Sequence, residues 1–152
     1  MKIVKFKDRG LFFVFFFIIS IIVLDRVSKE VVWMNYRDLV VWNSGITLGF
    51  LTPDSVLSKL LLQLIIIVAV ICFVFWLSGE FRKKVRNYLV ILPLGMVVAG
   101  GVSNLFDRIF WGSVLDFIPF FTLWTFNVAD FSISAGVVLL ILGKLFYGTK
   151  NT

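Results

Sequence analysis

Three aspartates stand close together in a segment that is otherwise mostly apolar: Asp107, Asp116 and Asp130. Carboxylates held among membrane segments are costly to keep there, which makes them candidates for a functional site. Two carboxylates that meet in a partly desolvated site cannot both ionise easily, so one of them holds a proton near neutral pH. The ionised member can then activate a water while the protonated member polarises a carbonyl group. This segment therefore predicts hydrolysis by an aspartate pair.

The residue types that the chain lacks narrow the chemistry further. There is no histidine and a single cysteine, Cys72, in the middle of an apolar run. One thiol cannot form an internal disulfide, and without histidine neither a Cys–His zinc site nor a Ser-His-Asp triad is available. We interpret Cys72 as a small residue facing lipid or another helix. We expect no metal and no cofactor.

The composition favours a membrane protein. Of the 152 residues 60% are hydrophobic, 18 are phenylalanine, and the mean hydropathy is +1.01. A soluble core of this size would not need so much apolar surface, so the surrounding solvent is expected to be lipid. The net charge of +6 would suggest nucleic acid in a soluble protein. Here the basic residues cluster in short loops beside apolar runs, so we expect membrane orientation and no nucleic-acid partner.

Four apolar runs predict an all-α membrane protein with four transmembrane helices in one domain over residues 1–152. The expected spans cover approximately residues 11–33, 59–78, 88–107 and 129–147. The first follows a basic arm but lacks a small-x-small cleavage pattern, so we interpret it as a retained helix and not as a signal peptide. The third carries a face of small residues that favours close helix packing in lipid, namely Gly95, Ala99, Gly100 and Ser103.

The distribution of charge predicts the orientation. Ten of the fifteen Lys and Arg residues lie in the N-terminal arm, the 79–87 loop and the C-terminal tail, whereas seven of the nine acidic residues lie on the opposite side. The positive-inside rule then puts both termini in the cytoplasm. The outer loop, at about residues 35–58, has β-prone runs around Asn43-Ser44-Gly45. We expect it to form a small hairpin or curved sheet on the membrane surface.

Polar residues at helical spacing converge on this outer side. Three helix ends carry such groups: Asp25 with Lys29, Asn104 with Asp107 and Arg108, and Asn127 with Asp130. Residues three or four apart share a helix face, and for the second group this requires the third helix to continue that far. The three ends are therefore expected to present polar groups to one interfacial space.

Most of these groups also have a purely structural explanation. Asp25 with Lys29 could be an ion pair at a helix end, and Asp107 with Arg108 could be an ion pair that orients a loop. Asp130 could be a helix cap. Asp116 has no cation nearby in sequence, and its alternative is an exposed interfacial acid. Two competing functions remain open, a transport protein that relays ions or protons through these acids and a structural membrane subunit. Ion relay would favour acids nearer the middle of the spans.

Five motifs in order resemble those of the type II (lipoprotein) signal peptidases, the aspartic proteases of bacterial membranes. The family patterns are D-x-x-[ST]-K, N-x-G-x-x-[FL]-[GS], G-[AG]-x-[GS]-N-x-x-D-R, V-x-D-[FM] and F-N-x-A-D. The matching segments are residues 25–29, 43–49, 100–108, 114–117 and 126–130. The chain departs from the family where Thr47-Leu48 replaces the common Ala-Phe, where Ser103 replaces glycine, and in a short interval between Asp116 and Asp130.

The resemblance implies a role for each polar residue. Asp116 and Asp130 take the positions of the catalytic pair. Supporting or substrate-binding roles fall on the remaining motif residues: Asp25, Lys29, Asn43, Gly45, Asn104, Asp107, Arg108 and Asn127. Of these, Asp25 and Lys29 would hold the outer end of the first helix. Asp107 would support the site, while Arg108 and Asn104 would place the substrate and the loop.

The resemblance also implies the substrate and the location. The family cuts diacylglyceryl-modified prolipoproteins just before the lipidated cysteine and works in the bacterial inner membrane without a cofactor. Globomycin-like peptide antibiotics inhibit it and would be expected to occupy the aspartate pair. Membrane lipids are the expected surroundings, and we expect a monomer.

Overall fold

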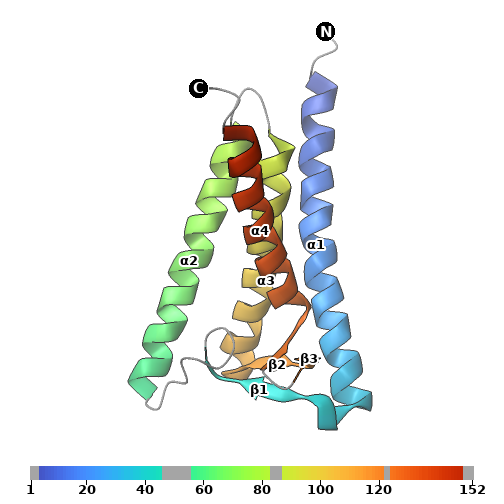
Figure 1. Ribbon diagram of the computed structural model, residues 1–152, viewed down its shortest axis with the longest axis vertical. Helices are drawn as coiled ribbons and strands as arrows, with labels where there is room; N and C mark the ends of the chain where they lie inside the picture. The colour runs from blue at the N-terminus through green and yellow to red at the C-terminus, as the bar shows by residue number, and fades with distance from the viewer. Residues whose placement is uncertain (1–3, 46–55, 83–86, 122–123, 149–152) are drawn as a thin grey trace.

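The computed structural model describes residues 4–45, 56–82, 87–121 and 124–148, and the structural statements below concern these residues. Four helices form its frame: α1 (Val4–Asn35), α2 (Val56–Arg82), α3 (Tyr88–Trp111) and α4 (Val128–Gly148). Figure 1 shows them running alternately up and down, with the short strands gathered at one end of the bundle. The ends of α1 and α3 and the starts of α2 and α4 therefore point toward the same end.

The outside of the bundle is apolar. Phe12, Phe16, Ile65 and Phe75 are each more than half exposed, and they belong to a long series of exposed large hydrophobic side chains. Such a surface is stable in lipid and not in water. Two helical segments, Gln63–Arg82 and Tyr88–Trp111, are long and apolar enough to cross a membrane, while the apolar part of α4, Val128–Gly143, is shorter.

Helix α3 is the centre of the bundle and packs against the other three helices. The four small residues expected on its packing face are all buried. At Gly100 the helices approach so closely that a Cβ atom would collide with the carbonyl oxygen of Ala129 and with Ile133 of α4. This close approach brings the start of α4, and hence Asp130, against the polar end of α3.

Helix α3 is longer than the sequence indicated. The apolar run suggested an end near residue 107, but the helix continues to Trp111 and closes on Gly112. Gly112 has a φ of 72°, and its N–H donates to the carbonyl of Arg108 at 3.1 Å, which is a left-handed glycine cap. Asp107 and Arg108 are therefore helical, which was the condition for their sharing a face with Asn104.

Four short strands and one 3₁₀ turn, η1 (Arg37–Leu39), accompany the helices, as the expectation of a mostly helical fold with a small β structure had it. Strand β1 (Val41–Asn43) pairs antiparallel with β2 (Val114–Asp116), and β3 (Ile118–Phe120) pairs antiparallel with β4 (Trp124–Phe126). The described partner of β1 follows α3 and is far away in sequence. The second β-prone run, residues 46–50, lies outside the described residues.

Candidate active site

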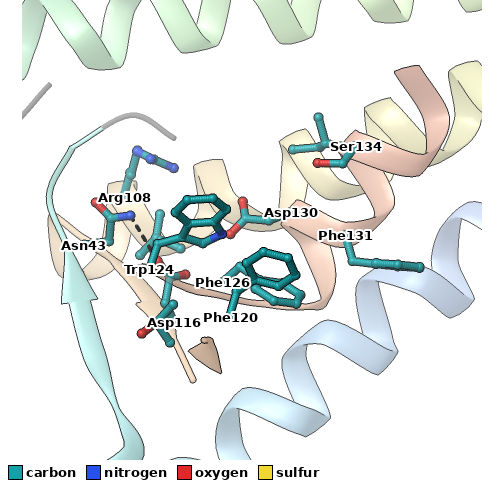
Figure 2. A pocket seen from close by; sticks show the side chains of 12 residues that line it. Asn43, Arg108, Asp116, Phe120, Trp124, Phe126, Asp130, Phe131 and Ser134 are labelled. Carbon is teal, nitrogen blue, oxygen red and sulfur yellow. Dashed lines mark hydrogen bonds between the residues drawn. The ribbon is translucent and has the colours of Figure 1, made fainter. Parts of the chain in front are cut away.

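Asp116 is the last residue of β2 and is buried, with 1% of its surface exposed. Each carboxylate oxygen accepts a hydrogen bond from an amide: Oδ2 from Nδ2 of Asn43 at 3.0 Å, and Oδ1 from Nδ2 of Asn127 at 2.7 Å. Figure 2 shows Asn43 reaching Asp116 from the neighbouring strand β1. The structural alternative for Asp116, an exposed interfacial acid, is therefore wrong.

The surroundings of Asp116 raise its pKa to about 7, mainly because burial removes water from the carboxylate and also because the negative charge of Asp130 lies near. The amides of Asn43 and Asn127 and the charge of Lys29 oppose this rise. A carboxyl group with a pKa near neutral can hold or release a proton at working pH, which general acid–base catalysis requires.

Asp130 lies in the first turn of α4 and forms a reciprocal cap with Asn127. The N–H of Asp130 donates to Oδ1 of Asn127 at 2.9 Å, and the N–H of Asn127 donates to Oδ2 of Asp130 at 3.3 Å. This is the arrangement of a capping box. Oδ1 of Asp130 also accepts a 2.7 Å bond from Nδ2 of Asn104. Asp130 is therefore a helix cap, as the alternative had it, and it is also tied to the polar end of α3.

One cavity of about 300 Å³ contains both aspartates. Figure 2 shows Asp116 entering from β2 and Asp130 from the start of α4, with Asn43 and Arg108 beside them. Its other walls are mostly apolar, and include the rings of Phe120, Trp124, Phe126 and Phe131. An apolar cleft with a few converging polar groups is typical of a ligand or substrate site.

Two amides connect the aspartates to each other. Besides its bonds to Asp116 and Asp130, Asn127 donates from Nδ2 to Oδ1 of Asn104 at 3.1 Å and to the carbonyl of Leu115 at 3.3 Å. The same Oδ1 of Asn104 also accepts a hydrogen bond from Nζ of Lys29 at 3.2 Å. A continuous set of hydrogen bonds therefore runs from α1 through α3 to both carboxylates.

Next to these hydrogen bonds, and joined to them through Lys29, lies a cluster of four charged side chains. Nζ of Lys29 is 2.8 Å from Oδ2 of Asp25 and 2.8 Å from Oδ2 of Asp107. Arg26 bridges the same two carboxylates, at 3.0 Å from Asp25 and 2.5 Å from Asp107. The predicted ion pair of Asp25 with Lys29 is confirmed, and it is one edge of a cluster of equal positive and negative charge.

Asp25 also joins α1 to the other helices. Its Oδ2 accepts the hydroxyl of Ser103 at 2.6 Å, and its Oδ1 accepts the N–H of Ala129, at the start of α4, at 2.9 Å. A carboxylate at a helix N-terminus satisfies a free N–H and favours the positive end of the helix dipole. The charge cluster thus fixes the start of α4, from which Asp130 projects.

Arg26 is the residue that sequence reasoning missed. It occupies an unspecified position of the first motif and directly follows Asp25, so helical spacing gave it no partner. The signal that could have found it is charge balance, because Asp25, Asp107 and Lys29 alone would leave one buried negative charge.

Asp107 and Arg108 do not pair with each other, so the structural alternative proposed for them is wrong. Besides its two cations, Asp107 accepts the N–H of Leu115 at 3.3 Å, and it does not line the cavity of the other two aspartates. Arg108 instead lines that cavity and donates from Nη2 to the carbonyl of Gly45 at 2.9 Å. The N–H of Gly45 donates to Oδ1 of Asn43 at 2.9 Å.

The predicted site residues are therefore brought together, but in two layers. Asp116, Asp130, Asn43 and Arg108 face the cavity. Behind them lie the buried residues that hold the first group in place: Asp25, Lys29, Asn104, Asp107 and Asn127. Among the described residues, no group of three His, Cys, Asp or Glu side chains is arranged to hold a metal ion.

Comparisons with known proteins identify the family and the fold. A sequence model of the family described as signal peptidase (SPase) II matches residues 17–146. A lipoprotein signal peptidase of Sulfurihydrogenibium sp. (strain YO3AOP1) is 35% identical over 151 residues, covering 86% of this chain and 90% of that protein. One from Wigglesworthia glossinidia brevipalpis is 31% identical over 146 residues, covering 86% and 92%. A solved structure of a bacterial membrane enzyme has the same fold, with a TM-score of 0.72, 20% identity and 91% of each chain covered.

Proposed function

This chain belongs to the signal peptidase II family, and we propose that it removes the signal peptide from diacylglyceryl-modified prolipoproteins, cutting just before the lipidated cysteine. The family is one of aspartic proteases. The observation that carries the proposal is that Asp116 and Asp130, from separate elements, line one cavity.

The proposed reaction uses one proton shared by the two carboxyl groups. The ionised member takes a proton from a water whose oxygen attacks the scissile carbonyl carbon, while the protonated member donates a hydrogen bond to the carbonyl oxygen. The tetrahedral intermediate then breaks its C–N bond, and the amine leaves with a proton from the pair. Because the two groups titrate as a pair, base and acid are not assigned to single residues.

The surrounding residues have supporting roles in this proposal. Asn43, Asn104 and Asn127 hold the two carboxylates by donating to their oxygens. Arg108, by donating to the carbonyl of Gly45, fixes the chain just after β1. Asp25, Lys29 and Asp107 brace the helix ends behind the amides.

The proposed membrane placement has four spans, with both termini in the cytoplasm and the strands at the outer face of the bacterial inner membrane. The basic residues of the arm, the 79–87 loop and the tail support this orientation. The signal segment would then lie among the helices while the acyl chains of the substrate stay in lipid. A globomycin-type peptide would bind in the same cavity, and the enzyme would act as a monomer without a cofactor.

The test is a cleavage assay in detergent micelles with the same prolipoprotein in its lipid-modified and unmodified forms. We expect cleavage of the lipid-modified form alone, and a loss of about 10²- to 10⁴-fold in turnover for Asp130→Asn. Asp38→Asn is the matched control, because Asp38 is exposed on η1 and does not line the cavity. Cleavage of the unmodified form at the same rate would contradict the proposed substrate.

A further inference from the structure

A second cavity, of about 560 Å³, lies behind the first. The β1–β2 ribbon forms the wall between them, since side chains of a strand alternate between its two faces. Asp116 and Asn43 line the first cavity, whereas Leu115 and Trp42, which are cross-strand partners, line the second. The second cavity is therefore a separate space on the far side of the ribbon from the aspartate pair.

Aromatic rings make up much of its lining. Trp33, Trp42, Trp111 and Phe106 contribute, and the rings of Trp33 and Trp42 meet edge to face with centroids 5.5 Å apart. Helix α1 ends at Asn35 and α3 ends at Trp111, so the cavity lies at the level where both helices stop. Tryptophan is enriched at this level of membrane proteins, where lipid headgroups meet the acyl chains.

The two cations in the lining are already engaged. The ammonium group of Lys29 has three N–H donors, and its contacts with Asp25, Asp107 and Asn104 use all three. Arg26 bonds to the same two carboxylates, and its guanidinium lies 5.3 Å from the ring centroid of Phe106. The positive charges of both cations are therefore matched by two carboxylates, although Nε of Arg26 has no hydrogen-bond partner in the part of the chain that the structure describes.

The acidic residue Glu30 is different. It lines the cavity, is exposed, and forms no ion pair with any residue in the part of the chain that the structure describes. Arg37 lies 4.9 Å from the ring centroid of Trp33 and Arg26 lies 6.0 Å from that of Trp111, so these two rings already face a cation, whereas Trp42 faces none among the described residues. A carboxylate beside the ring of Trp42 is the combination that binds an ammonium group, by charge and by cation–π attraction. The remaining apolar lining, which includes Val27 and Leu115, suits an acyl chain.

We propose that this second cavity binds a phospholipid with an ammonium headgroup, whose ammonium lies against Glu30 and the ring of Trp42 and whose acyl chain lies along the apolar lining. The inference uses the membrane placement proposed above and does not depend on proteolysis. The occupant is a resident lipid of the outer leaflet and not the scissile substrate.

The test is native mass spectrometry of the full chain in detergent, titrated with short-chain phosphatidylethanolamine, with phosphatidylglycerol of the same chains, and with the matching diacylglycerol. We expect phosphatidylethanolamine to bind at least about fivefold more tightly than either of the others, which is about 1 kcal/mol for the ammonium contact. Equal binding of phosphatidylglycerol would overturn the choice of headgroup, and equal binding of diacylglycerol would reduce the cavity to an acyl-chain site.

Two variants and a control locate the binding. Glu30→Gln and Trp42→Leu should each weaken phosphatidylethanolamine binding about fivefold, while Asp38→Asn, which removes a charge from an exposed acid outside the cavity, should not. Unchanged binding in both cavity variants overturns the proposal, and the second variant serves if the first does not fold. Asp130→Asn should bind the lipid as the unaltered chain does, so a failure of proteolysis and a failure of lipid binding are seen separately.

Discussion

The side-chain amide of Asn127 donates a 2.7 Å hydrogen bond to Oδ1 of Asp116. Asn127 is fully buried, and it also caps α4 by accepting the N–H of Asp130 on its Oδ1. One amide therefore fixes the end of β2 relative to the start of α4. The distance between the two carboxylates depends on this residue more directly than on any contact between the aspartates themselves.

The first prediction concerns the pH dependence of this contact. The Asn127 amide lowers the pKa of Asp116, which burial and Asp130 raise to about 7. Removing the amide in Asn127→Ala should raise that pKa further. The step near pH 7 removes the last proton of the pair, so the basic limb of the pH profile of kcat/KM should move to higher pH, by about one unit or less. Asn35→Ala, at an exposed amide bonded to its own helix, should leave the profile unchanged. A shift to lower pH would contradict the account.

Burial of Asp116 should also appear in the stability. Because its pKa of about 7 in the folded chain lies above the ordinary value of 3.8, the folded state holds a proton between these values that the unfolded state has released. The free energy of unfolding should therefore fall as pH rises from about 4 to 7, by about 3 kcal/mol from this group.

Thermal unfolding in detergent at pH 5 and pH 8 measures that dependence. The Asp116→Asn variant, which cannot ionise there, should lose less stability than the unaltered chain between the two pH values. An equal loss in both proteins would show that Asp116 does not titrate in this range.

The charge cluster should be essential for stability. Lys29→Met leaves Asp25 and Asp107 with Arg26 alone, so one buried carboxylate charge loses its compensation. A buried charge left unpaired costs about 3–5 kcal/mol. We expect a large fall in the midpoint of thermal unfolding, whereas Arg37→Gln, on an exposed residue, should change it little. A Lys29→Met variant as stable as the parent would mean that the cluster is not closed to water.

The close approach of α3 and α4 gives a prediction with an internal control. Gly100→Ala puts a methyl group against the carbonyl of Ala129 and the side chain of Ile133, so α4 must move and carry Asp130 with it. We expect a loss of about 1–3 kcal/mol in stability, and of activity as well. Gly79→Ala, at a helical position with nothing within 4 Å, should be neutral or slightly stabilising. Both variants are compared by unfolding midpoint and cleavage rate.

Local spacing predicted those parts of the site that depend on one helix. The i, i+4 pair of Asp25 and Lys29 and the i, i+3 pair of Asn127 and Asp130 are both present as expected. The convergence of three helix ends followed from the alternating direction of the helices. These features need nothing beyond periodicity and helix geometry.

Contacts between distant segments could not be predicted in the same way. The pairing of Asn43 with Val114 joins strands that are separated by two helices, and short strands carry a weak periodic signal. Asp107 was considered with its neighbour Arg108, although its partners, Arg26 and Lys29, come from another helix. Sequence adjacency says little about pairing on a helix, because consecutive side chains point in different directions.

The most direct test of the central claim is single-turnover cleavage of lipid-modified prolipoprotein by Asp116→Asn, Asp130→Asn and the double variant, with folding checked by thermal unfolding. Groups that act as one unit are strongly non-additive, so the double variant should be about as slow as either single variant. Each single variant should lose about 10²- to 10⁴-fold. Full activity in either folded single variant, or losses that multiply in the double variant, would contradict a catalytic pair formed by these two residues.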